Sequence, residues 1–160
     1  MRAVQPVSRR PWLAALFAGI GLVSSACNMT PAAKSPEVAG PKPNIFGDWL
    51  IESVETRPVI DSSPARLSFG ADARVTGNAS CNSLMGTFKQ SGAAIAIDNV
   101  ATTRRLCAEA QMEQEKRVLG AVSRVNSAAL VNGLLELSGD GKLLIRAAPA
   151  SAAKAASAPG

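Results

Sequence analysis

The chain has 160 residues, which is enough for one domain of ordinary size, and 47% of them are hydrophobic. It contains 17 lysines and arginines, 12 aspartates and glutamates and no histidine, so its formal charge is +5. Without histidine, Ser/His and Cys/His nucleophile pairs are excluded, and a zinc ion would have no imidazole ligand.

The first residues have the pattern of a bacterial export signal. Arginines precede an uncharged apolar run from Trp12 to Ala26. This run is shorter than the about 20 apolar residues that a membrane-spanning helix needs, so we expect a cleaved signal peptide over residues 1–26. The stretch Ser8–Leu13 also resembles the twin-arginine export motif, so the general and the twin-arginine routes both stay open.

The end of the apolar run resembles a bacterial lipobox, in which small residues precede a cysteine that is lipidated and becomes the new N-terminus. Ser24 stands where leucine is usual, so ordinary cleavage after Ala26 stays an alternative. An unpaired exposed cysteine is a liability in an oxidising compartment, and lipidation explains Cys27 better than a chance free thiol. We therefore predict a lipid anchor on Cys27 in a bacterial membrane, the outer in preference to the inner, with the domain facing the periplasm.

Removal of the leader changes the charge of the protein. Arg2, Arg9 and Arg10 precede Cys27 and no acidic residue does, so the formal charge falls from +5 to +2. A charge this small does not indicate a basic surface for nucleic acid. We expect no nucleic-acid partner.

Two segments without hydrophobic period flank the expected domain. Residues 28–43 are rich in proline and alanine and predict a disordered tether, which with Cys27 makes up segment 27–45. Residues 147–160 contain no large apolar side chain and predict a disordered tail. The domain is therefore expected at residues 46–146.

The first part of the domain has strand patterns. Residues 47–54 place Trp49 and Ile51 on one face, and a loop bounded by prolines follows over residues 57–64. Ile95 and Ile97 alternate with small or polar residues, as in half-buried strands. Two hairpins are predicted, with strands at 65–69 and 73–77 and at 85–90 and 93–100.

The pattern changes to a helical period over residues 108–125. The apolar stripe of this helix consists of Met112, Leu119, Val122 and Val125, with Val118 beside it. We expect the stripe to pack in the core, with a partner groove as the alternative. Glu113 and Arg117 are expected to pair in water at i,i+4. Gly120 weakens the helix by about 1 kcal/mol relative to alanine, unless close packing against a strand requires the missing side chain.

A closing hairpin over residues 134–146 completes the pattern. Its turn, Ser138–Gly141, lies between Leu137 and Leu143. Strands in meander-like order with one helix predict a small α+β domain.

The stretch GNASCNSLMGTF, residues 77–88, connects predicted strands. Gly77 and Gly86 suit positions where a side chain would clash, and Asn78 and Asn82 can close turns through nearby backbone amides. Cys81 is expected to face inward from this connection.

Once Cys27 is assigned to lipid, only Cys81 and Cys107 remain, and one intramolecular pairing is available to them. A disulfide between them would stabilise the domain by about 3 kcal/mol in the chain-entropy model. A redox pair usually shows CxxC spacing or an activating histidine, and the sequence has neither. We interpret the pair as structural.

The sequence contains no pattern of a catalytic or metal centre. Ser80 and Ser83 lie in no GxSxG elbow, and the domain contains no SxxK motif. Four aspartates occur singly in expected turns and not in a calcium-loop spacing: Asp61, Asp72, Asp98 and Asp140. We predict no catalytic residue, no metal site, no cofactor and no enzymatic activity.

Arg104 and Arg105 form a solvated pair in our interpretation, with an acidic partner or a lipid headgroup as the alternative.

The domain resembles the META domain of HslJ-like bacterial envelope proteins. The resemblance covers Phe46 to Arg146 and is carried by these residues: Trp49, Leu67-Ser68-Phe69, Gly77, Cys81-Asn82, Gly86, Phe88, Thr103, Cys107, Glu115 and the terminal hairpin. It implies an antiparallel sheet curled into a partly open barrel around one helix, a place in the envelope, and a loose link to heat shock or antibiotic tolerance. It implies no agreed reaction. The chain departs from the family at Ser80, where glycine is usual, and at Leu84 and Phe88, where tyrosine is usual.

Two functions stay open at this point. The first is a non-catalytic envelope lipoprotein that binds or stabilises another envelope component. The second is a pilotin-like or inhibitor-like module that captures a peptide segment of an exported protein, by edge-strand addition or in a groove between helix and sheet. An open apolar cleft would favour the second, and a fully closed core the first.

Overall fold

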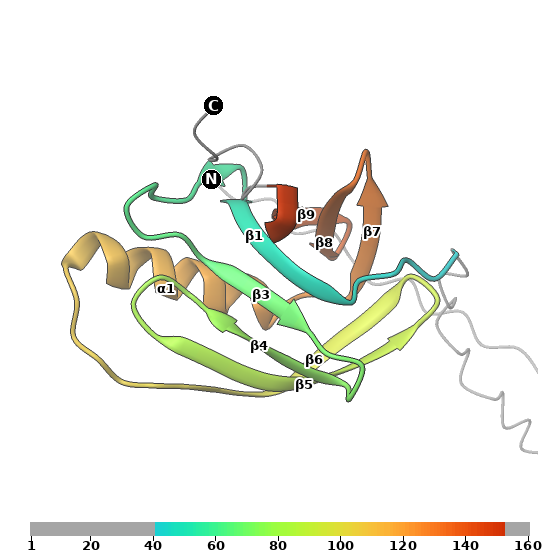
Figure 1. Ribbon diagram of the computed structural model, residues 1–160, viewed down its shortest axis with the longest axis horizontal. Helices are drawn as coiled ribbons and strands as arrows, with labels where there is room; N and C mark the ends of the chain where they lie inside the picture. The colour runs from blue at the N-terminus through green and yellow to red at the C-terminus, as the bar shows by residue number, and fades with distance from the viewer. Residues whose placement is uncertain (1–40, 153–160) are drawn as a thin grey trace, which may run out of the picture. The chain divides into compact units, whose positions relative to one another are not determined.

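The computed structural model describes residues 41–152 (Figure 1). The predictions for the signal peptide, for Cys27, for residues 28–40 of the tether and for residues 153–160 of the tail lie outside them. The described elements are β1 (Gly47–Val54), β2 (Arg57–Pro58), β3 (Arg66–Phe69), β4 (Arg74–Asn78), β5 (Ser83–Ser91), β6 (Ala94–Thr102), α1 (Glu109–Val122), β7 (Ser127–Val131), β8 (Leu134–Gly139) and β9 (Lys142–Pro149). No helix in this part of the chain has the length and apolar character needed to cross a membrane.

The strands form one antiparallel sheet that curls into a ring (Figure 1). From β3 to β9 each strand pairs with the next, β1 pairs with both β3 and β9, and β2 adds to the end of β1. The ring is weakest between β6 and β7, where the register contains only Ala94 opposite Ser127. The structure confirms the predicted α+β class, with a sheet that is not quite a closed barrel around one helix.

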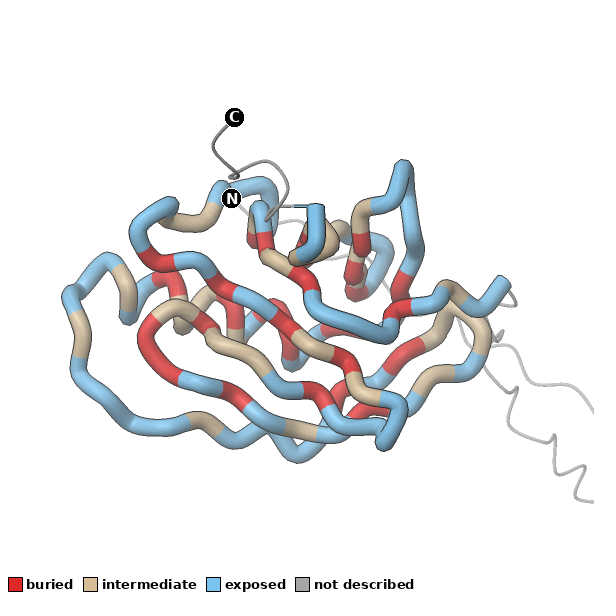
Figure 2. The backbone as a smooth tube through the Cα atoms, viewed as in Figure 1, coloured by how far each residue is buried: buried red, intermediate tan, exposed pale blue. Residues whose placement is uncertain are grey.

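The core lies on the inner face of the curled sheet. Buried positions alternate with more exposed ones along the strands, as Figure 2 shows and as Leu135, Leu137 and Gly139 illustrate in β8. This period of two follows from the pleat, which turns successive side chains to opposite faces. The helix packs against β9 and β1 and contributes Val118 and Val122 to the same core.

The predicted hairpins are present, and two short strands were not predicted. β7 was missed, although Asn132 and Gly133 after it both have positive φ and form a recognisable hairpin turn to β8. Arg57 and Pro58 were expected in a loop but form the two residues of β2.

The folded domain extends beyond residues 46–146 at both ends. Ile45 is fully buried, and its carbonyl accepts a hydrogen bond from Trp49 Nε1 at 2.8 Å. Ala147 is also fully buried and pairs with Ile51 and Leu135. The predicted tail therefore began too early, because β9 continues through Pro149. Small apolar residues such as alanine carry little sequence signal, yet they fit where strands approach closely.

The buried face of the helix differs from the predicted apolar stripe. Met112 is 40% exposed and Leu119 is only partly buried, whereas Gln114 is fully buried. The prediction of a core position is wrong for Met112, whereas Leu119 packs against the core with part of its side chain. Glu113 lies 4.0 Å from Lys116 at i,i+3, in place of the predicted pair with Arg117.

Gly120 provides a direct test of helix stability. Apart from the backbone of the helix itself and the neighbouring residues, a Cβ added there would meet no heavy atom of the described residues within 4 Å, so no close packing requires the glycine. We expect Gly120→Ala to raise the free energy of unfolding by about 1 kcal/mol, measured by urea denaturation. Gly77→Ala is the matched control and should destabilise, because its Cβ would lie 2.1 Å from the Arg66 carbonyl oxygen. A loss of stability in Gly120→Ala would contradict the open surroundings of this position.

Candidate functional site

The connection between β4 and β5 is a tight turn held by its own side chains. Asn78 Oδ1 accepts a hydrogen bond from the Ser80 amide at 2.8 Å, as the sequence predicted for Asn78. Ser80 has φ of 115°, a region that favours glycine, which gives a physical reason for the glycine usual at this position. The Ser80 hydroxyl compensates in part, because its oxygen lies 2.8 Å from the hydroxyl of the buried Ser63.

Cys81 follows this turn and forms a disulfide with Cys107, as predicted. The two Cα atoms lie 5.9 Å apart, and 26 positions of sequence separate the residues. Cys81 is buried, and Cys107 lies two residues before α1. The bond therefore ties the β4–β5 turn to the segment that leads into the helix.

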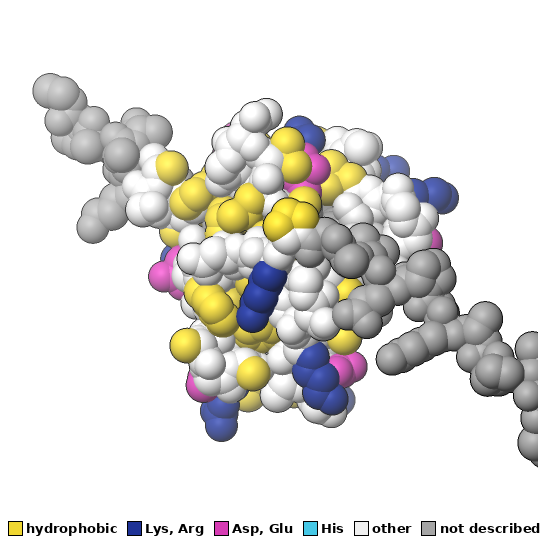
Figure 3. All heavy atoms as spheres, turned by 90° about the vertical axis from the view of Figure 1, so that its right-hand side faces the viewer, with side chains coloured by type: hydrophobic (Ala, Val, Ile, Leu, Met, Phe, Trp, Pro, Cys, Tyr) yellow, Lys and Arg dark blue, Asp and Glu magenta, His cyan; other side chains and the backbone are white. Residues whose placement is uncertain are grey.

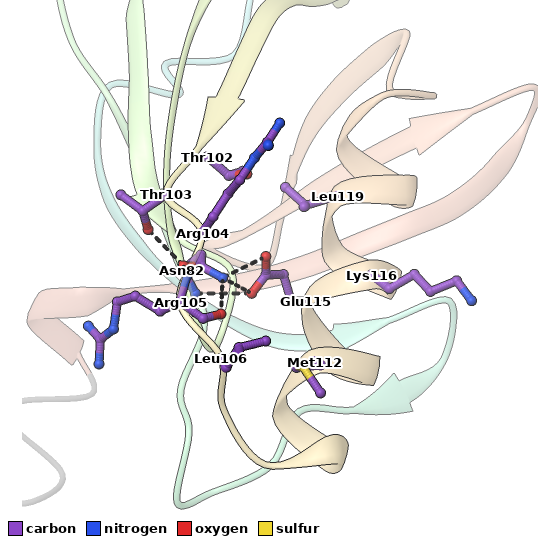
Figure 4. A pocket seen from close by; sticks show the side chains of 10 residues that line it. All are labelled: Asn82, Thr102, Thr103, Arg104, Arg105, Leu106, Met112, Glu115, Lys116 and Leu119. Carbon is purple, nitrogen blue, oxygen red and sulfur yellow. Dashed lines mark hydrogen bonds between the residues drawn. The ribbon is translucent and has the colours of Figure 1, made fainter.

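Asn82 is the centre of a buried hydrogen-bond network next to the disulfide (Figure 4). Its Oδ1 accepts from the Arg105 amide at 2.7 Å and from the Thr103 hydroxyl at 2.8 Å. Its Nδ2 donates to the Arg105 carbonyl oxygen at 3.3 Å and to both Glu115 carboxylate oxygens at 3.1 and 3.0 Å. The Asn82 amide donates to Glu115 as well, at 3.0 Å. Contrary to the prediction, the Asn82 side chain does not close a local turn but joins β5, the segment before α1, and the helix.

A second buried amide fixes the helix on another side. Gln114 is fully buried, accepts from the Ile60 amide at 2.6 Å and donates to the Ser63 carbonyl oxygen at 2.7 Å. Since Ile60 and Ser63 belong to the loop before β3, the helix is held from two directions by polar side chains. A polar residue such as Gln114 is expected on the surface of a helix, so the hydrophobic period of the sequence could not predict its burial.

A groove of about 470 Å³ lies between α1 and the segment before it, beside the Asn82 network (Figure 4). One wall is the stretch Thr102–Leu106, and the other is a helix face. That face consists of Met112, Glu115, Lys116 and Leu119, which follow the i, i+3, i+4, i+7 spacing of one side of a helix. The size falls within the about 300–1,000 Å³ of typical ligand pockets.

The groove combines apolar and cationic side chains. Leu106 is 94% exposed, and Leu106 and Leu119 point from opposite walls into the groove, with Arg104 running along it (Figure 4). Arg105 and Lys116 extend away from its centre. Glu115 is the one acidic lining residue, and Asn82 already occupies both of its oxygens. Neither Arg104 nor Arg105 makes an ion pair within the described residues.

Other exposed hydrophobic side chains of the described residues lie outside the groove. Figure 3 shows the face at the right-hand end of Figure 1, where hydrophobic side chains form small groups among polar and cationic atoms. Leu130 and Val131 of β7 are 42% and 41% exposed. Exposed apolar residues of this kind are normal on protein surfaces. They provide control positions for experiments on the groove.

The described residues do not bring together a group of metal-ligating side chains. Within residues 41–152 no group of three or more histidine, cysteine or acidic side chains could hold a metal ion. Leu84 and Phe88, where the family usually has tyrosine, are buried, and Phe88 packs edge-on against Phe69 with ring centroids 5.2 Å apart. At Glu55, a hydrogen bond from Arg124 and the charge of that guanidinium lower the pKa of the exposed carboxyl. That pair is a surface ion pair and lines a different hollow.

The domain combines a curled antiparallel sheet, one helix, and a Cys-Asn turn that is bonded to a Thr-x-x-x-Cys segment. These features together define one class of small α+β domain. The family model of the META domain matches residues 44–151. The chain belongs to the META domain family. This is not a known enzymatic family, and membership supports at most an envelope-type domain without an assigned reaction.

Solved structures share the fold. An NMR structure of a protein is 25% identical, with a TM-score of 0.52, and the match covers 64% of this chain and 88% of that one. An NMR structure of a protein from Burkholderia xenovorans is 16% identical, with a TM-score of 0.54 and coverage of 72% and 96%. A crystal structure of a DUF4847 family protein from Bacteroides vulgatus ATCC 8482 is 16% identical, with a TM-score of 0.50 and coverage of 65% and 94%. No curated protein matches the chain.

Proposed function

We propose that the protein is an exported, lipid-anchored binding module whose META domain captures a segment of another envelope protein in the groove between Thr102–Leu106 and α1. It binds without turnover. Any contribution to stress or antibiotic tolerance then acts through the bound partner.

The observation that carries this proposal is an open groove with fixed walls. The side chains of the hydrophobic core are buried, whereas Leu106 and Met112 are 94% and 40% exposed beside the groove. The disulfide and the Asn82 network hold the wall that carries Leu106. A segment whose backbone is already held in place loses less entropy when a partner covers it, which favours binding. Of the two functions that the sequence left open, the groove supports peptide capture.

The lipid anchor has its own test. We expect Cys27→Ser to leave the protein soluble in the periplasm, because the lipid on this cysteine is what holds it at the membrane. Cell fractionation and metabolic fatty-acid labelling measure the effect. If the variant fractionates with membranes as the parent does, and the parent takes up no label, then the anchor is assigned to the wrong residue or is absent.

The groove is tested by photo-crosslinking in the native host. A photo-reactive amino acid replaces Leu106, whose exposure leaves room for the substitution. We expect a discrete adduct with one exported protein. The adduct should disappear when Arg104→Glu is added to the same chain, because charge reversal disturbs the groove and not the core.

The same photo-reactive group at Leu130 is the matched control. It is exposed on β7, which does not line the groove. Equal adducts from both positions, or none from Leu106, would contradict binding in the groove.

A further inference from the structure

We infer that the segment captured in the groove binds as an extended strand, which pairs with the backbone of Thr102–Arg104 and carries an acidic side chain for Arg104 and an apolar side chain for the helix face. This inference rests on the proposed function and specifies the form and chemistry of the partner.

One edge of β6 has no strand of the described residues beside it over most of its length. β6 pairs with β5 from Ser91 opposite Ala94 to Leu84 opposite Thr102. On its other side it meets β7 only at Ala94 opposite Ser127, with one further bond from the Ile95 amide to the Asn126 carbonyl. The far end of β6 therefore leads into the groove with one side unpaired in the described sheet. An unpaired strand edge is a template for another chain.

The hydrogen bonds after Thr102 show which backbone groups face the groove. The Thr103 amide donates to the Ser83 carbonyl of β5 at 3.1 Å, and the Arg105 amide donates to Asn82 Oδ1 at 2.7 Å. Amides of successive residues in an extended chain point to opposite edges. The amides of Thr102 and Arg104 consequently point away from β5, toward the groove. The Arg104 amide has no hydrogen-bond partner within residues 41–152.

Asn82 acts in place of one more residue of β5. Its side chain bonds both the amide and the carbonyl oxygen of Arg105, which is what a neighbouring strand would do. The disulfide at Cys107 fixes the end of the same segment. The edge is thus held extended before any partner arrives, so its ordering does not reduce the affinity.

The opposite wall determines the side chains of the partner. Leu119 and Met112 provide apolar contact, and Leu106 faces them from the strand side. Arg104 runs along the groove, with Arg105 and Lys116 at the rim. Alternate residues of a strand share one face, so a segment with an acidic and an apolar residue two positions apart matches both features.

The first experiment selects the partner chemistry without assuming a sequence. A displayed library of random dodecapeptides is selected on the purified full chain with its disulfide intact, and counter-selected on Leu106→Asp. We expect binders enriched in acidic and β-branched residues. Their affinity should fall about tenfold in Arg104→Glu, which corresponds to about 1.4 kcal/mol. Leu130→Asp is the matched control for Leu106→Asp and should leave the affinity for the peptides unchanged, since it adds the same single negative charge outside the groove.

The second experiment tests the backbone pairing. Amides of a selected peptide are N-methylated at alternate positions in two sets. One set should reduce affinity more than about tenfold by removing main-chain hydrogen bonds, and the other should have little effect. In the protein, Arg104→Pro should weaken binding further than Arg104→Ala, because both remove the charge but only proline removes the amide. If Arg104→Pro does not fold, the methylated peptides decide alone.

The outcomes separate the two proposals. Groove-dependent binding that both methylated sets retain equally would overturn strand addition and leave capture in the groove intact. Failure to select any peptide, together with no adduct from Leu106, would overturn both. If the protein binds vesicles of phosphatidylglycerol through Arg104 and selected peptides do not compete, the face is a membrane surface and both proposals are wrong.

Discussion

Removal of the disulfide is expected to lower the free energy of unfolding by about 3 kcal/mol, the size that the chain-entropy model gives for a loop of this length. Cys81 and Cys107 are separated by 26 positions, and the bond restricts the unfolded chain between them. Since small domains are stable by about 5–15 kcal/mol, this loss is a large fraction of the total. The double variant Cys81→Ala, Cys107→Ala avoids a free thiol and is measured by urea denaturation.

The matched control for this prediction is Cys27→Ser, which replaces a cysteine outside the described domain and should leave the unfolding free energy unchanged. Reduction of the parent should have the same effect as the double variant. Hydrogen exchange at the Arg105 amide adds a local readout, because loss of the bond frees the segment before α1. Equal stability of the double variant and the parent would show that the disulfide contributes nothing to the fold.

Much of the domain follows from local patterns. Alternating residues in β1 and the glycine turn between β8 and β9 predict those elements, and the cysteine count predicts the disulfide. β7 was missed because Ser127–Val131 has few large side chains, although Asn132-Gly133 marks its turn. The pairing of β1 with β9 could not be predicted from local patterns, because pairing between chain ends leaves no local signal, and only the family resemblance implied a curled sheet.

The groove was only partly visible in the sequence. The sequence favours a solvated charge for Arg104 and a core position for the stripe with Met112, with an acidic partner or lipid headgroup and a partner groove as the alternatives. Because Gln114 is buried, the buried face of the helix is not the predicted apolar stripe. Met112 therefore lies beside the groove and not in the core. A polar residue is buried only where partners satisfy it, and those partners, Ile60 and Ser63, are more than fifty positions away. Spacing alone cannot reveal such a partnership.

Asn82→Asp is expected to cost about 3 kcal/mol at neutral pH, because it places a second carboxylate against Glu115 in a buried site. Asn82 is 5% exposed, and its Nδ2 lies 3.0 Å from the nearer Glu115 oxygen. The substitution replaces this donor with an acceptor and also removes the hydrogen bond to the Arg105 carbonyl oxygen. It therefore disturbs the wall of the groove as well as the fold.

The loss should depend on pH in a defined direction. Burial and the neighbouring carboxylate raise the pKa of the introduced carboxyl in the folded protein above its value in the unfolded chain. The folded state then binds more protons than the unfolded state, so stability falls as pH rises through this range and recovers as pH falls. Urea denaturation at about pH 5 and about pH 8, on either side of physiological pH, measures the difference. Asn82→Ala introduces no ionisable group and should lose similar stability at both values. If Asn82→Asp follows the pH profile of Asn82→Ala, the two carboxylates do not meet, and Asn82 does not bridge β5 and the helix in solution.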